Sequence, residues 1–355
     1  MISSEPLTQQ SKPDVVHFAR LEQPAPCGAS CLQPHTFILG PKRIDGGAWG
    51  RVGKTGRLAA ESIDEQQRRF GPAEWGLSGA LALIWGSSFL WIAIAIDDVS
   101  AGLVPVARCG FGVAGLLCIP AARRRIERAH LVRFALTGLC WMTIPFLLYP
   151  LAEQTVDSSI TGMINGGLPV VTTVVTALLT RTRPSPRRVL AVCVGSLGIA
   201  IISLSSVSSG TSADAKGIAL LIVALVFYAV ATNIARPLQA AYGALPAMLW
   251  ITVFGAIWSL PVGIASLSRS HVTASAIGAL FVLGFIGTGF AFAIFSVLLT
   301  RAGPVRGMIG IFFTPIVGLV LGITVRHDPF HWVAVLGMAV VIAGAVLTSR
   351  PEPAR

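Results

Sequence analysis

Between Trp75 and Ser349 the chain alternates long apolar segments with short polar loops. A hydrocarbon core about 30 Å thick requires roughly 20 apolar residues of helix to cross it. About ten segments of the chain have this length, so the pattern predicts an all-α integral membrane protein with ten transmembrane helices. They lie near residues 76–96, 101–121, 131–152, 158–180, 188–207, 214–236, 245–266, 273–300, 305–326 and 331–349.

The first 72 residues have a different composition, with frequent polar residues, proline and glycine and no sustained apolar period. This composition favours a disordered or weakly structured tail over residues 1–72. No apolar stretch typical of a signal peptide follows Met1, so we expect the first helix to act as the targeting signal. Residues 351–355 form a short C-terminal tail.

Basic residues give the predicted orientation. With ten crossings, the clusters at 123–133 and 181–188 lie on the side of the N-terminus, and only Lys216, Arg269 and Arg326 lie on the other side. The positive-inside rule therefore predicts a multi-pass protein of the cell membrane with both termini in the cytoplasm. Since topology accounts for these residues, the net charge of +11 does not indicate nucleic-acid binding.

A short sequence pattern recurs in the two halves of the chain. Residues 162–171 and 307–317 both begin with Gly-Met-Ile and both contain a proline followed by apolar residues, Pro169 and Pro315. Each copy lies in the fourth helix of a set of five. Because five is odd, the second set enters the membrane from the opposite face, which is the inverted repeat of many secondary transporters. We therefore predict two five-helix repeats, at 73–210 and 211–350.

Several motifs between Trp75 and Arg350 resemble those of EamA-type transporters of the drug/metabolite transporter superfamily. The run 85–89, Trp-Gly-Ser-Ser-Phe, resembles the first-helix motif, and Pro105 with Arg108 resembles the second-helix pattern. Residues 152–169 and 303–318 are similar to the joints between the third and fourth helices of each repeat. The sequence departs from the family where a Glu usually precedes the last helix of each repeat, since Thr182 and Asp328 stand near these positions.

The resemblance implies a central cavity between two five-helix repeats. It implies a secondary transporter that moves small polar or amphipathic metabolites, such as amino-acid-like compounds or drugs, by alternating access, with efflux favoured. Lipid-translocating or nucleotide-sugar relatives remain alternatives, as does a non-transporting membrane receptor or enzyme. An intramembrane enzyme would require a zinc-binding His pair, paired aspartates or a Ser/His pair within the helices, and the sequence has none of these patterns.

Neutral polar and aromatic residues on the predicted helices are the main candidates for the cavity wall. Such residues orient an amphipathic ligand through a few hydrogen bonds and aromatic contacts, although each also suits interhelical packing. The candidates are Trp85, Ser87, Ser88, Trp141, Tyr149, Asn165, Tyr228, Asn233, Thr288, Phe312, Phe313 and Thr314.

Ionisable residues within a membrane are costly and usually functional. Arg108 lies several residues into the second helix, where it either contacts an anionic substrate group or reaches the interface as a structural residue. Glu153 lies at the end of the third helix and is the candidate for coupling transport to an ion. Pro169 and Pro315 are candidates for helix breaks at matching positions of the two halves, which mark the binding region in many transporters.

The cysteines do not indicate a metal site. Cys27 and Cys31 form an isolated pair without two further ligands, and the other four lie within apolar segments. We expect no cofactor, no metal and no catalytic residue. The expected partners are a small-molecule substrate and the lipid bilayer, and the oligomeric state is left open.

Overall fold

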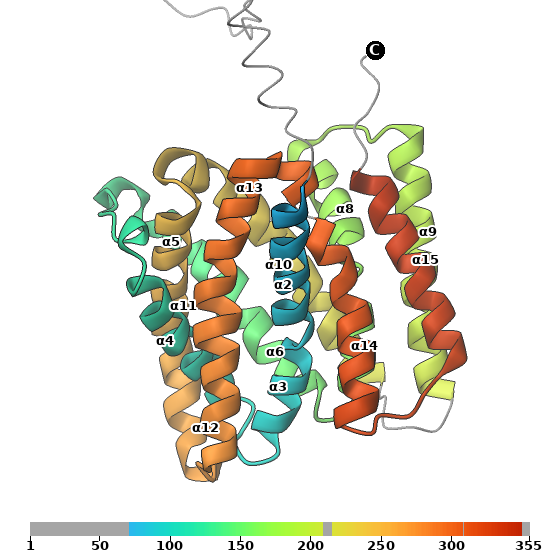
Figure 1. The fold of residues 1–355 in the computed structure, drawn as a ribbon, viewed down its shortest axis with the longest axis horizontal. Helices are drawn as coiled ribbons and strands as arrows, with labels where there is room; N and C mark the ends of the chain where they lie inside the picture. Colours follow the sequence, from blue (N-terminus) through green and yellow to red (C-terminus); the bar gives the residue numbers. More distant parts are fainter. Residues whose placement is uncertain (1–70, 209–214, 308, 350–355) are drawn as a thin grey trace, which may run out of the picture. The chain divides into compact units, whose positions relative to one another are not determined.

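The computed structural model describes residues 71–208, 215–307 and 309–349, and within these residues all regular structure is helical. This confirms the predicted all-helical class for the described part of the chain (Figure 1). Most of the N-terminal tail, with Cys27 and Cys31, and the C-terminal tail at 351–355 lie outside the described residues.

In the first half, residues 71–208, most apolar segments consist of consecutive short helices rather than one continuous helix. Stretches of 3-10 or π-helix are denoted η. The elements are α2 (Pro72–Gly86), α3 (Ser88–Ile96), α4 (Leu103–Leu117), η1 (Pro120–Ala122), η2 (Arg128–His130), α5 (Leu131–Gly138), the π-helix η3 (Leu139–Thr143), α6 (Ile144–Ala152), α7 (Ser158–Asn165), α8 (Leu168–Thr180) and α9 (Pro186–Ser208).

The second half, residues 215–349, follows the same order after two long helices. Its elements are α10 (Ala215–Tyr242), α11 (Ala244–Ser266), η4 (Leu267–Arg269), α12 (Ala274–Phe281), the π-helix η5 (Val282–Phe290), α13 (Ala291–Gly307), η6 (Ile309–Phe313), α14 (Thr314–Val325) and α15 (Trp332–Ser349).

The described helices differ in their capacity to span a bilayer. Six are long and apolar enough to cross it, and α7 with α8 forms a further pair that is bent by 43°. Three apolar helices are shorter, at Leu103–Leu117, Gly310–Val325 and Trp332–Leu347. The count of ten crossings therefore remains a prediction, while a multi-pass arrangement is clear.

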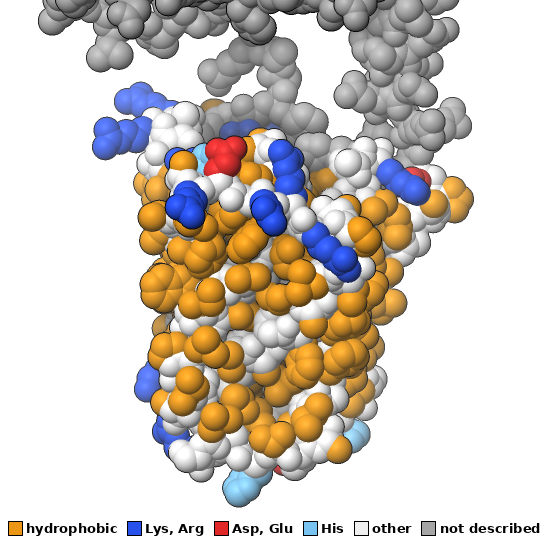
Figure 2. Space-filling view, turned by 90° about the vertical axis from the view of Figure 1, so that its left-hand side faces the viewer, with side chains coloured by type: hydrophobic (Ala, Val, Ile, Leu, Met, Phe, Trp, Pro, Cys, Tyr) orange, Lys and Arg blue, Asp and Glu red, His pale blue; other side chains and the backbone are white. Residues whose placement is uncertain are grey.

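The outer surface of the bundle is apolar over most of its height. Leucines such as Leu178 and Leu204 are 72% and 70% exposed. On the face shown in Figure 2, hydrophobic side chains cover the middle and most Lys and Arg side chains gather towards one end. An apolar surface of this extent is suited to lipid rather than water.

Both predicted helix breaks lie at the junction of two helical pieces. Pro169 is the second residue of α8, directly after the Gly166–Gly167 break, and Pro315 is the second residue of α14, after η6. The structure thus places both prolines in the first turn of a helix and not in a helix interior. Proline suits this position because its missing N–H group would have no helical partner there.

Glycines bring the two halves into close contact. A Cβ atom on Gly289 would lie 2.9 Å from the Cα atom of Gly115, and one on Gly162 would lie 3.3 Å from the Cα atom of Gly318. On one side of the bundle, α9 and α15 pack together in the same way through Gly195 and Gly344 (Figure 1). In lipid, helix association depends on such close packing because the apolar drive is absent.

The two π-helices occupy equivalent places in the two halves. Each lies in the third apolar segment of its half and packs against the second segment of the other half, η5 against α4 and η3 against α11. Gly112 admits Thr288 of η5, and Gly255 admits Met142 of η3. The packing is consistent with a repeated five-segment unit.

We predict that Gly115→Leu destabilises the bundle, because the new side chain would force α4 away from η5. Overpacking of this kind costs about 1–3 kcal/mol, and the melting temperature in detergent should fall. Gly110→Leu is the matched control on α4, since nothing lies within 4 Å of a Cβ atom at Gly110. Equal melting temperatures for the two variants would contradict the packing argument.

Candidate functional site

Arg108 brings a permanent positive charge into the interior of the bundle. Its side chain on α4 is 8% exposed, and its Nε atom donates a hydrogen bond to Thr288 Oγ1 at 3.3 Å. The central guanidinium carbon lies 3.8 Å from the ring centroid of Phe146 on α6, a cation–π contact. Among the described residues no carboxylate forms an ion pair with Arg108.

The π-helix η5 places the partner of Arg108. Thr288 Oγ1 bonds to the carbonyl of Leu283, five residues earlier, at 3.4 Å. The preceding carbonyl, of Gly287, accepts a hydrogen bond from Trp85 Nε1 at 3.1 Å. A π-helical turn shifts the hydrogen-bond register, and such turns are frequent at functional sites. Here the turn links α2, η5 and α4 at one point.

Tyr149 forms the centre of an adjoining aromatic group. Its hydroxyl donates to Asn165 Oδ1 at 2.6 Å, which joins α6 to the break between α7 and α8. The Tyr149 ring lies 5.8 Å from Phe89 and 5.9 Å from Tyr228 between centroids. Because Tyr149 follows Phe146 by three residues on α6, both rings lie on nearly the same helix face.

The structure brings together six of the candidates proposed from sequence. We define the central site as Arg108, Thr288, Trp85, Tyr149, Asn165 and Tyr228 together with Phe146. Trp141 adjoins this site through Phe292, whose ring also contacts Trp85.

The other candidates have local partners. Ser87 and Ser88 both donate to the carbonyl of Ile84, and Thr314 donates to the carbonyl of Ile311. Further candidates are placed as follows: Asn233 exchanges hydrogen bonds with Thr176 between α10 and α8, Phe313 is 44% exposed, and Phe312 is half-buried. These placements suit helix packing, and the hydrogen bonds named here do not reach the central site.

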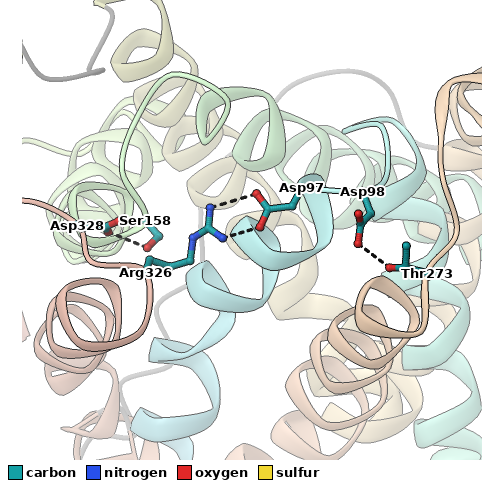
Figure 3. A network of polar contacts seen from close by, with 6 residues as sticks. All are labelled: Asp97, Asp98, Ser158, Thr273, Arg326 and Asp328. Atoms are coloured by element: carbon teal, nitrogen blue, oxygen red, sulfur yellow. Dashed lines mark hydrogen bonds and ion pairs between the residues drawn. The ribbon is translucent and has the colours of Figure 1, made fainter.

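Acidic residues join the two halves at one end of the bundle, which we call the acidic end (Figure 3). Arg326, after α14, forms two hydrogen bonds with Asp97 at the end of α3. Asp328 Oδ2 accepts hydrogen bonds from Ser158 Oγ and Ser159 N, both at 2.9 Å, at the start of α7. Asp98 accepts a hydrogen bond from Thr273, which caps α12.

The opposite end, the basic end, is joined by different contacts. The Tyr242 hydroxyl at the end of α10 accepts from Glu127 N at 3.2 Å and lies 2.6 Å from His130 Nδ1. Trp250 Nε1 donates to the carbonyl of Arg124 at 2.8 Å. The halves therefore meet at both ends, and at the acidic end side-chain carboxylates accept the hydrogen bonds that join them.

Several of these residues were not among the sequence candidates. Phe146 was missed although its spacing from Tyr149 placed it on the same helix face. Asp97 and Asp98 were missed because their partners lie on helices far along the chain. Among the described residues, no group of three or more His, Cys, Asp or Glu side chains is arranged to hold a metal ion.

Comparisons with known proteins agree with this architecture. The model of the EamA-like transporter family matches residues 75–204 and 215–350, which gives two copies. An uncharacterized transporter of Archaeoglobus fulgidus is 22% identical over 279 residues, covering 78% of this chain and 99% of that protein. The uncharacterized transporter YoaV of Bacillus subtilis is 22% identical over 280 residues, covering 76% and 94%.

One solved crystal structure superposes with a TM-score of 0.54 at 18% sequence identity. It covers 76% of this chain and 94% of its own, and this likeness supports the fold alone. The expected resemblance to EamA-type transporters is confirmed by the family match.

We predict that Thr288→Val lowers the melting temperature in detergent, because the buried Arg108 guanidinium loses an acceptor. Loss of such a partner costs about 1–3 kcal/mol. Thr324→Val is the matched control, since Thr324 is exposed and its hydroxyl donates to the carbonyl of Val320 on its own helix. A shift no larger than that of the control would show that Thr288 does not stabilise Arg108.

Proposed function

Because the chain belongs to the EamA-like transporter family, we propose that it moves small amphipathic metabolites bearing a carboxylate through the central site. Membership in this family and two relatives named as transporters indicate a membrane transporter rather than an enzyme. The carboxylate-bearing substrate class, efflux and alternating access are the proposal.

The observation that carries the proposal is the unpaired charge of Arg108. A guanidinium group is always ionised in proteins, so burial cannot be relieved by loss of a proton. Thr288 and the Phe146 ring supply only a neutral acceptor and an aromatic face. A carboxylate matches the forked geometry of the guanidinium group through two parallel hydrogen bonds. An anionic substrate would therefore complete the charge balance that the described residues leave open.

The aromatic residues of the central site suit the rest of such a substrate. Trp85, Tyr149, Tyr228 and Phe146 come from three different helices and present ring faces next to polar groups. Ligand sites of this type are largely apolar, with a few polar groups that set the orientation. Amino-acid-like compounds with apolar side chains meet both conditions.

Alternating access is supported by the equivalent packing of the two halves. The Arg108–Thr288 contact of the central site lies between α4 and η5, where segments of opposite halves meet. In inverted-repeat transporters, the two halves rock around a site at their interface. In such a cycle, the contacts at the acidic end would break while those at the basic end hold, and the reverse would follow. Export would release the substrate at the acidic end.

We predict that Arg108→Gln weakens the apparent affinity for carboxylate substrates by about tenfold or more, since a desolvated charged contact is lost. Arg108→Lys should retain part of the attraction and lose the paired geometry. The measurement is counterflow in proteoliposomes, with L-leucine and L-phenylalanine tested against the amines that lack their carboxylates.

Arg133→Gln is the charge-matched control, because Arg133 is an exposed arginine at the start of α5. Rates are normalised to inserted protein. Equal transport of the acids and their amines by the unmodified protein, or unchanged affinity in Arg108→Gln, would exclude substrate contact by Arg108.

A second prediction concerns the proposed topology. Reporter fusions after Arg188 and Arg355 should be cytoplasmic, and one after Ser212 should be external, because the basic clusters resist translocation. A cytoplasmic reporter after Ser212 would contradict the count of ten crossings.

A further inference from the structure

Glu153 directly follows α6, in the turn that leads to α7 at the acidic end. Its two carboxylate oxygens each expose less than 1 Å² and have no hydrogen-bond partner. The residue as a whole is only partly buried, so its exposed area lies outside these two oxygens. A carboxylate enclosed without partners is costly in its ionised form.

Glu153 is one of the residues that line a small polar cavity of about 80 Å³. Its walls come from both halves, with Asp157 and Ser158 from the first and Arg326 and Asp328 from the second. This volume accommodates a few water molecules and is far smaller than a typical metabolite site. The cavity therefore suits a small inorganic species rather than the transported substrate.

Two cations and one anion act on Glu153 from other elements. Burial raises the pKa of the Glu153 carboxyl well above its ordinary value, and the carboxylate of Asp328 adds to this effect. The guanidinium groups of Arg108 and Arg326 act in the opposite direction but do not cancel it. The neutral, protonated carboxyl is the form that fits the closed acidic end.

Other titratable groups surround the turn. Tyr149 lies one helical turn earlier on α6, and Asp157 lines the cavity. The start of α10 packs against the turn, where Gly217 lies against Thr155, and its charged residue there is Lys216. The nearby loops at this end also carry His271, His327 and His331.

A proton fits this site better than a metal ion. Hard cations require several oxygen ligands arranged around them. Asp328 Oδ2 is already engaged by Ser158 Oγ and Ser159 N at the start of α7. The two oxygens of Glu153 have no polar neighbour within bonding distance, and a proton needs only one of them.

We propose that Glu153 and the cavity beside it form a proton-binding site, and that closure of the acidic end requires a proton on Glu153. This inference rests on the proposed transport function only for its role in the cycle. When the acidic end opens, water reaches the carboxyl group and the proton leaves to the solvent, leaving a carboxylate. When the end closes, the carboxylate takes up a proton from the same solvent before it is dehydrated.

The site links closure to pH in a defined direction. Since the closed state holds the proton more tightly, acid favours closure and rising pH favours opening. At pH values between the pKa of Glu153 in the open state and its pKa in the closed state, the ratio of open to closed molecules rises about tenfold for each pH unit. The hydrogen bond from Ser159 N to Asp328 reports closure, because it joins the two halves.

The test is hydrogen–deuterium exchange of the peptide over residues 153–161, in purified full-length protein without substrate, between about pH 5 and pH 8. After correction for intrinsic exchange, protection in the unmodified protein should fall as pH rises. Glu153→Gln mimics the protonated group, so its protection should stay high and independent of pH. Glu127→Gln, an exposed carboxylate at the basic end, should behave like the unmodified protein.

Asp328→Asn provides an independent variant, because the amide oxygen can still accept the hydrogen bonds of α7. Removing the negative charge should move the pH response to lower pH. Asp157, Asp328 and the three histidines remain in Glu153→Gln, so a pH response that persists there belongs to one of these other groups and overturns the proposal. Because no substrate is present, failure of the proposed substrate class leaves this outcome unaffected.

Discussion

A bilayer offers the backbone no hydrogen-bond partner, and this constraint governs where the chain can depart from a regular helix. The described departures include the π-helices η3 and η5, the break between α7 and α8, and the transition from η6 to α14. Each lies next to another helix of the bundle. The carbonyl of Gly287 in η5, for example, accepts a hydrogen bond from Trp85 Nε1 on α2. The irregular backbone therefore coincides with the contact between halves.

The irregular backbone at the contact between the halves explains why polar residues concentrate at that contact. A π-helical turn at η5 presents the Gly287 carbonyl to Trp85 and the Thr288 hydroxyl to Arg108. In a regular helix at this point, these groups would form hydrogen bonds within the same helix or would face the lipid. The glycines of α4 and η5 bring the two backbones close enough for the short threonine side chain to reach the guanidinium group. Close packing and the buried charge therefore depend on each other.

Sequence reasoning succeeded where a local rule applied. Apolar length predicted the helices. The paired proline motif marked the positions where α8 and α14 begin, and the scarcity of charge drew attention to Arg108, which the structure buries. It could not supply contacts that depend on distant partners. Asn233 was proposed for the cavity wall from its polar side chain alone, and its hydrogen bond to Thr176 on α8 became visible only in the structure. The enclosure of Glu153 depends on Arg326 and Asp328, which reach it only after the second half has packed.

The charge of Arg108 and that of the ionised form of Glu153 are opposite and influence each other without a direct bond between the two side chains. If Glu153 is protonated, Arg108 is the uncompensated charge, and its attraction for an anion is greatest. If Glu153 is ionised, it offsets part of that charge and weakens the attraction. Linkage requires the converse as well, so an anion bound at Arg108 raises the proton affinity of Glu153. A carboxylate in the central site would thus promote proton uptake at the acidic end, and binding and closure would reinforce each other.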